Sequence, residues 1–101
     1  MNSWTPISED QVKALLSNEL LLCSPEQRVL FEAFRVPLRK VPIVRHGAVE
    51  MDYVVAQDGN SVLYYEDVEE GFNLSSLGPC GEIATPCFEQ WKLSHALANW
   101  V

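Results

Sequence analysis

The spacing of apolar residues changes once along this chain, and that change limits the folds available to it. Before Pro37 the apolar residues recur every three or four positions, as they do on one face of a helix. From Leu38 to Tyr65 they alternate with polar residues, which is typical of half-buried strands. The pattern predicts an α+β domain with two N-terminal helices, a four-stranded antiparallel meander sheet and a C-terminal helix, the helices packed on one face.

Two helices are predicted in the first part, each with its own start signal. Ser8 to Gln11 and Ser24 to Gln27 both have the Ser-x-x-Gln form of a capping box. In this box the serine oxygen accepts from the third helical N–H, and the glutamine reaches back to the serine N–H. We therefore expect helices at about 9–21 and 25–35. Pro37 disfavours helical geometry at Val36 and ends the second one.

The first hairpin is predicted to turn at His46-Gly47. A three-residue loop from His46 to Ala48 places Ile43 opposite Met51, which joins apolar to apolar, whereas a two-residue loop places Ile43 opposite Glu50. The three-residue form is the expectation. Pro42 cannot donate to a neighbouring strand, so the first strand is expected at the edge of the sheet or at a bulge.

The second hairpin is predicted to turn at Asp58-Gly59, a dipeptide favoured in type I′ turns. This turn pairs Val55 with Val62 and Tyr53 with Tyr64. Glu50 and Asp52 then point outward. The predicted inner face consists of Met51, Tyr53, Val55, Val62 and Tyr64.

The last third of the chain is predicted to hold one more strand and one more helix. Phe72 and Leu74 indicate a short fourth strand, and Ser75 to Pro86 is expected to form an ordered loop. The last helix is expected to start near Phe88. Its apolar stripe consists of Leu93, Ala96, Leu97 and Trp100.

Length and composition favour one small cytoplasmic domain over residues 1–101. The chain is 48% hydrophobic and 21% charged, an ordinary globular composition. Its start lacks the basic and apolar segments of a signal peptide, and its three cysteines make an odd count for a disulfide framework. No apolar run approaches the length of about 20 residues that spans a bilayer.

Charge is divided unevenly between the two halves. Residues 1–46 carry six basic and five acidic side chains, a net of +1, and residues 47–101 carry one basic and nine acidic, a net of −8. The total of −7 argues against binding to nucleic acid and to anionic membrane surfaces. A partner recognised by charge is expected to be a basic protein, drawn to the second half.

Neither a metal site nor a catalytic centre is predicted. Cys80 and Cys87, with His95 and Cys23, supply enough ligand atoms for zinc, but their spacing is wider than the two to four residues usual in structural sites. Free thiols and no cofactor are therefore expected. His46 and His95 are the only histidines that could act as a base, and no nucleophile elbow, phosphate loop or dinucleotide motif accompanies them. An enzyme is not the expected class.

The leading functional hypothesis is a non-catalytic cytosolic protein-binding module. Its specific form is an acidic inhibitor or immunity-type protein that masks a basic partner. The alternatives are a small-molecule or enzymatic domain with a pocket between sheet and helices, and a homodimer joined through an edge strand. The predicted partner-binding residues are Glu50, Asp52, Glu66, Asp67, Glu69 and Glu70.

Overall fold

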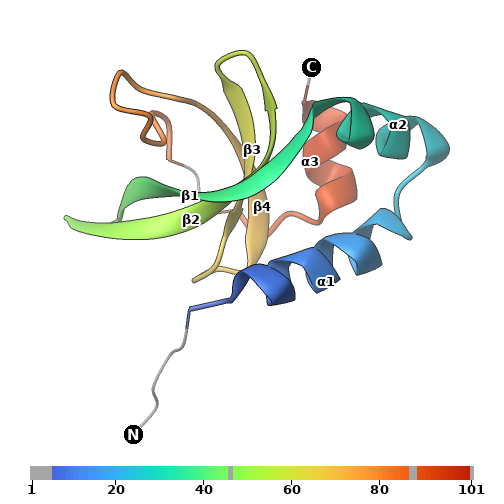
Figure 1. The fold of residues 1–101 in the computed structure, drawn as a ribbon, viewed down its shortest axis with the longest axis horizontal. Helices are drawn as coiled ribbons and strands as arrows, with labels where there is room; N and C mark the ends of the chain where they lie inside the picture. The colour runs from blue at the N-terminus through green and yellow to red at the C-terminus, as the bar shows by residue number, and fades with distance from the viewer. Residues whose placement is uncertain (1–5, 46, 87–88, 101) are drawn as a thin grey trace, which may run out of the picture.

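The predicted α+β architecture is confirmed. A computed structural model describes residues 6–45, 47–86 and 89–100. The elements in chain order are α1 (Glu9–Leu20), α2 (Pro25–Phe34), β1 (Arg35–Arg45), β2 (Ala48–Asp58), β3 (Ser61–Glu66), β4 (Gly71–Ser76) and α3 (Leu93–Asn99) (Figure 1). The four strands form one antiparallel sheet in the order β1-β2-β3-β4. Among the described helices none has the length and apolar character needed to cross a membrane.

Both helix starts form as their sequences predict. The Gln11 N–H donates to Ser8 Oγ at 3.1 Å, and the Ser8 N–H donates to Gln11 Oε1 at 2.8 Å. Ser24 and Gln27 make the same pair of bonds at 3.1 and 2.9 Å. Each box satisfies N–H groups that the first helical turn leaves without a partner.

The Ser8→Ala variant is expected to lower the free energy of unfolding by about 0.5–2 kcal/mol, because it removes the oxygen that accepts from the Gln11 N–H. Ser17→Ala is the matched control, since Ser17 is exposed inside the same helix, where alanine is the better helix former. Urea denaturation measures both. A Ser8→Ala midpoint equal to that of the unchanged protein would show that the capping box adds no stability.

The predicted register of the first hairpin is wrong. Arg45 pairs with Ala48, and Ile43 pairs with Glu50 in place of Met51, as in the two-residue alternative. His46 itself lies outside the described residues. The shift is explained by a second covered face, where Ile43 and Val41 are buried. The edge position predicted for the first strand is confirmed, and its register shifts between Arg35 and Arg39.

The second hairpin also differs from its prediction. Asp58 pairs with Ser61, so the loop residues are Gly59 and Asn60, and Val62 lies opposite Gln57 in place of Val55. Gly59 has the positive φ expected of it, 59°, but Asn60 does not share it, so the turn is not type I′. The register then shifts between Val54 and Ala56, where a bulge adds one residue to β2.

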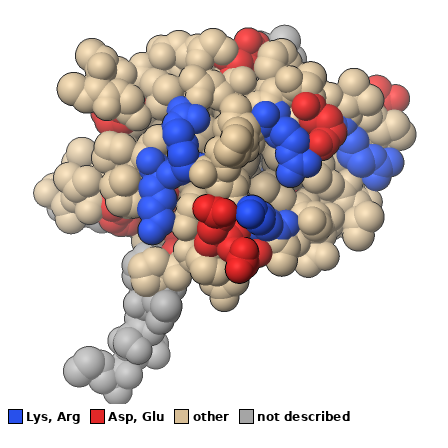
Figure 2. Space-filling view, viewed as in Figure 1, with Lys and Arg blue, Asp and Glu red and all other residues tan. Residues whose placement is uncertain are grey.

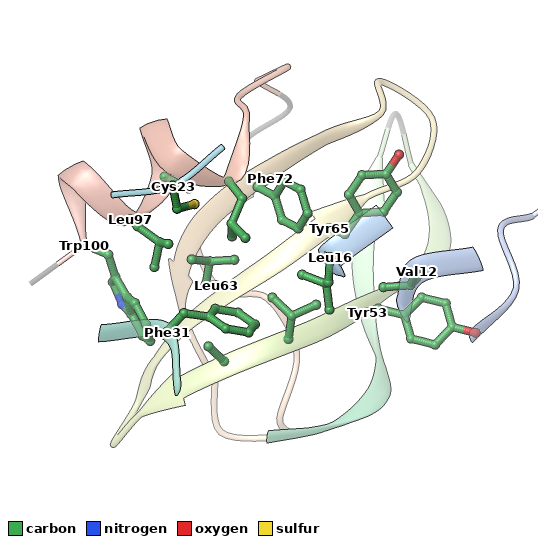
Figure 3. Close-up of a cluster of buried hydrophobic side chains, with 14 residues drawn as sticks. Val12, Leu16, Cys23, Phe31, Tyr53, Leu63, Tyr65, Phe72, Leu97 and Trp100 are labelled. Carbon is green, nitrogen blue, oxygen red and sulfur yellow. The ribbon is translucent and has the colours of Figure 1, made fainter. Parts of the chain in front are cut away.

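The sheet buries apolar side chains on both of its faces. On the helix face, Val12 and Leu16 of α1 and Leu97 of α3 gather with Leu63 and Tyr65 of β3 (Figure 3). The second face is covered in part by the segment after β4, whose Ile83 N–H donates to the Pro42 carbonyl at 3.0 Å. The buried apolar residues of that face are Val41, Ile43, Val54, Val62, Tyr64 and Ile83.

These faces correct the predicted inner face. Tyr53 and Val55 do belong to the helix side, but Val62 and Tyr64 pack on the opposite side, and Met51 is exposed. A shift of one residue in register moves every side chain of a strand to the other face. Because both faces are covered, the polarity of the residues could not select the register.

The last helix begins later than predicted. Its expected start, Phe88, lies outside the described residues, and the first helical residue is Leu93. Trp91 instead forms a bridge with Phe72 of β4, whose N–H donates to the Trp91 carbonyl at 2.9 Å. This extended segment closes the β4 side of the sheet before α3 starts. The predicted apolar stripe is buried throughout: Leu93, Ala96, Leu97 and Trp100.

Candidate functional site

Residues predicted to bind a partner meet at one pocket beside β2. Its volume is about 320 Å³, and its wall includes Glu50 and Asp52 of β2 and Asp67 of the turn between β3 and β4. Glu69 and Glu70 lie further along that turn, and neither lines the pocket. The described residues that line it are Pro6, Ile7, Lys40, Val49, Glu50, Met51, Asp52, Tyr53, Asp67 and Val68. We call this the acidic pocket.

The prediction that Asp52 points outward is wrong, and Glu66, predicted as a contact residue, is buried as well. Asp52 is 2% exposed and Glu66 is 0% exposed. One residue beyond the Tyr53–Tyr65 pair, the antiparallel register brings these two carboxyl groups to facing positions on β2 and β3. Both carboxyl groups are therefore buried in the unbound protein, and partner binding by all six predicted residues stays a prediction.

Glu66 has a role within the turn. Its Oε1 accepts from the Val68 N–H at 3.0 Å, and its Oε2 accepts from the Glu69 N–H at 2.7 Å. The turn ends at Glu70, whose φ of 58° lies in the left-handed region. The buried carboxylate thus replaces the partners that these N–H groups would have in a strand, and it fixes the position of Asp67 beside the pocket.

Asp52 has a strongly perturbed carboxyl group. Burial is the largest cause that raises its pKa from 3.8 to about 7, and the nearby carboxylates of Glu66 and Glu50 add to the rise. The backbone N–H of Asp67 donates to Asp52 and acts in the opposite direction. Asp52 Oδ2 is buried and has no hydrogen-bond partner among the described residues. Near neutral pH this group is therefore divided between its protonated and ionised forms.

The other wall of the acidic pocket joins the chain before α1 to the turn after β3. The Ile7 N–H donates to Asp67 Oδ2 at 2.8 Å, a bond between residues sixty positions apart. On the strand side the Lys40 ammonium lies 5.7 Å from the centre of the Tyr53 ring. Among the described lining residues three are acidic, Glu50, Asp52 and Asp67, and one is basic, Lys40.

Exposed apolar side chains also line the acidic pocket. Val49, Met51 and Val68 line the acidic pocket and are exposed, and Val44 of β1 is exposed opposite Val49. Sequence reasoning selected the carboxylates and missed this apolar component. A contiguous apolar surface edged by charge is the usual anatomy of a protein-binding site.

Several basic side chains lie along β1. Arg35, Arg39 and Lys40 belong to β1, the outer strand, and Figure 2 shows Lys and Arg side chains along its course. Charged side chains on an edge strand discourage pairing with other strands. The charge separation along the sequence is only partly kept in space, because Lys40 of β1 also lines the acidic pocket.

In the part of the chain that the structure describes, the cysteines and histidines do not form a catalytic or metal-binding cluster. Cys23 is buried and Cys80 is exposed, and both are free thiols; Cys87 lies outside the described residues. Burial raises the pKa of the Cys23 thiol. His95 is stacked on Trp91 with ring centres 4.5 Å apart. Over residues 6–45, 47–86 and 89–100, no three His, Cys, Asp or Glu side chains are grouped as metal ligands.

Comparison with protein-family models, with curated proteins and with solved structures gives no match. The acidic pocket, the exposed apolar residues around it and the burial of Asp52 are the features that bear on function.

Proposed function

We propose that this chain is a non-catalytic protein-binding domain whose acidic surface binds a basic protein partner. The observation that carries the proposal is the acidic pocket, whose lining includes Glu50, Asp52 and Asp67 together with exposed Val49 and Met51. Apolar contact supplies binding energy when it is buried, and surrounding carboxylates select a cationic partner and speed its approach. The net charge of −8 over residues 47–101 supports the same partner.

An inhibitor or immunity-type protein is the specific form of this proposal. Such a protein covers a basic functional surface of its target, so its own contact surface must be acidic and must not bind nucleic acid. A net charge of −7 on 101 residues meets both conditions. The cytoplasm is the compartment we propose for it.

Charge reversal on the β3–β4 turn tests the proposal. We expect Glu69→Lys with Glu70→Lys to slow association with a partner captured from native lysate by about tenfold at low salt, and to change dissociation less. Glu66 is left unchanged because it is buried and holds the turn. Association rates measured at low salt and at about 0.5 M salt should converge, because salt screens exposed charges.

The matched control reverses two exposed carboxylates on the helices, Glu9→Lys with Glu26→Lys, and makes the same change in net charge. It should slow association much less. If both double variants associate at the rate of the unchanged protein at every salt concentration, the charges serve solubility only and the proposal is wrong.

A small-molecule site is the second candidate, favoured by the volume of the acidic pocket and by the perturbed carboxyl group of Asp52. The acidic pocket lies at a strand edge. Two further pockets, of about 400 and about 290 Å³, lie between α1 and the sheet, the first lined by Leu16 and Val55 and the second by Leu15 and Tyr65. Titration with small amines and guanidines, followed by amide chemical shifts, tests this candidate. Saturable shifts confined to the pocket residues would favour it.

A further inference from the structure

The β1–β2 hairpin extends past the rest of the sheet, which leaves one side of β2 open. β2 pairs with β1 as far as Ala48, but its pairing with β3 ends at Tyr53 (Figure 1). Residues 48–52 therefore have a neighbouring strand on one side only. At about 3.3 Å per residue this open edge is on the order of 17 Å long, enough for a short extended segment.

Backbone groups of two residues face the open edge. The Pro42 carbonyl points away from β2, because it accepts from the Ile83 N–H on the outer side of β1. In an antiparallel ladder the partner of such a residue also points outward, so the N–H and C=O of Met51 face away from β1. The same holds for Val49, two residues earlier. No described residue forms a hydrogen bond with either residue from that side.

The two faces of this segment have different chemistry. Val49 and Met51 place apolar side chains on the face that also carries Tyr53, whereas Glu50 and Asp52 lie on the opposite face. A strand added beside β2 would set its own alternate side chains against these two rows, since residues on neighbouring strands pair across the same face. Apolar residues match the first row. In the second row Glu50 is half-buried and Asp52 is buried, so a cationic residue of the added strand would meet Glu50 first.

Charge selects one occupant for the edge. A second copy pairing antiparallel through its own residues 48–52 would set Glu50 opposite Glu50, and like charges at facing positions are destabilising. A segment that carries Lys or Arg meets the carboxylates instead. Among the described residues of the lining Lys40 is the one basic side chain, and it is placed over the Tyr53 ring.

We infer that the open edge of β2 at residues 48–52 accepts an extended segment of the basic partner, in which apolar residues alternate with Lys or Arg, as an added strand. The inference rests on the proposed function and names its mode of binding. Main-chain hydrogen bonds to Val49 and Met51 would hold the segment, and the side chains would select its sequence.

The experiment uses an eight-residue peptide in which Val and Lys alternate, titrated into the full chain and followed by amide chemical shifts. We expect the largest shifts at the Val49 and Met51 amides. A peptide with Glu in place of Lys should bind at least tenfold more weakly. A Val-Lys peptide that is N-methylated at alternate residues should not bind at these amides, because it keeps its charge and loses its donors on one edge.

Two proline variants form the matched pair. Val49 and Val44 lie opposite each other in one rung and are 67% and 57% exposed, but their backbone groups face opposite edges. Val49→Pro removes an N–H from the open edge of β2 and is expected to weaken binding of the Val-Lys peptide by about tenfold. Val44→Pro should leave binding within about twofold, since it alters only the β1 edge.

Several outcomes would overturn the inference. The N-methylated peptide could bind as tightly as the unmodified Val-Lys peptide, with binding weakened by Glu69→Lys with Glu70→Lys. The acidic surface would then be the site, and binding by strand addition would be excluded. Absence of shifts at Val49 and Met51 up to about 1 mM Val-Lys peptide would also overturn it. The inference would also be wrong if the Val49 and Met51 amides were protected from hydrogen exchange in the full chain and lost that protection when residues 1–5 were removed. A dimer detected by sedimentation and dissociated by Val49→Pro would likewise overturn it, because a second copy would then occupy the edge.

Discussion

Asp52→Asn is expected to stabilise the domain at neutral and alkaline pH and to remove much of the dependence of its stability on pH. In the unchanged protein the folded state raises the pKa of Asp52 from 3.8 to about 7. Between these values the folded state holds a proton that the unfolded state has released. The free energy of unfolding therefore falls as pH rises through this window, and it levels off above about pH 7.

The size of the effect follows from the shift. One pKa unit corresponds to about 1.4 kcal/mol, so a rise from 3.8 to about 7 corresponds to about 4 kcal/mol between low pH and pH 8. Asparagine cannot ionise, and its amide can donate to the carboxylates of Glu66 and Glu50 that surround this position. At pH 8 we expect the variant to be more stable by up to about 4 kcal/mol, and near pH 4 we expect the two proteins to be alike.

Urea denaturation at pH 4, 6 and 8 measures the difference. Asp58→Asn is the control, because Asp58 is an exposed carboxylate at the end of the same strand. It should follow the pH dependence of the unchanged protein. If the stability of Asp52→Asn depends on pH as that of the unchanged protein does, the Asp52 carboxyl does not retain a proton in the folded state near neutral pH.

Stability and binding are expected to compete at this residue. An ionised Asp52 favours a cationic ligand in the acidic pocket, and a protonated Asp52 favours the unliganded fold. A bound Lys or Arg side chain would stabilise the ionised form and lower the pKa of Asp52. Binding at pH 6 should therefore release protons, which calorimetry in buffers of different ionisation enthalpy can measure.

Local signals in the sequence were sufficient for the helices and insufficient for the strand register. A capping box depends on two residues three positions apart, so Ser8 with Gln11 could be recognised without any tertiary information. The register of Ile43 depends on what covers the second face of the sheet. Part of that cover is Ile83, forty residues away, and no alternation within the hairpin indicates it.

The candidate site was predictable in its charge and not in its shape. Carboxylates are expected at the surface, so nothing in the sequence marked Asp52 and Glu66 as buried. The open edge of β2 arises because β1 and β2 have eleven residues each and β3 has six. That difference was present in the length of the alternating segments, and comparing those lengths could have revealed the exposed row of Val49 and Met51.

Gly71→Ala is expected to be the most damaging small substitution in the sheet. Gly71 begins β4 and is buried against residues 89–91, where an added Cβ would overlap the Glu89 carbonyl oxygen and Gln90 Cα. That segment is held by the Phe72 N–H, which donates to the Trp91 carbonyl at 2.9 Å, and by the Glu89 N–H, which donates to Asn73 Oδ1 at 2.9 Å. Backbone fixed in this way cannot move aside.

Displacing this segment would also move the start of α3, whose Leu93 and Leu97 lie in the main core. We expect Gly71→Ala to lower the free energy of unfolding by about 3 kcal/mol, the upper part of the range for overpacked sites. Gly78→Ala is the matched control, because its Cβ would overlap only the end of the Glu82 side chain, which can turn away at a cost of about 1 kcal/mol or less. Urea denaturation followed by tryptophan fluorescence compares the two. A loss for Gly71→Ala no larger than that for Gly78→Ala would show that residues 89–91 do not pack against β4 as tightly as the Phe72–Trp91 bridge indicates.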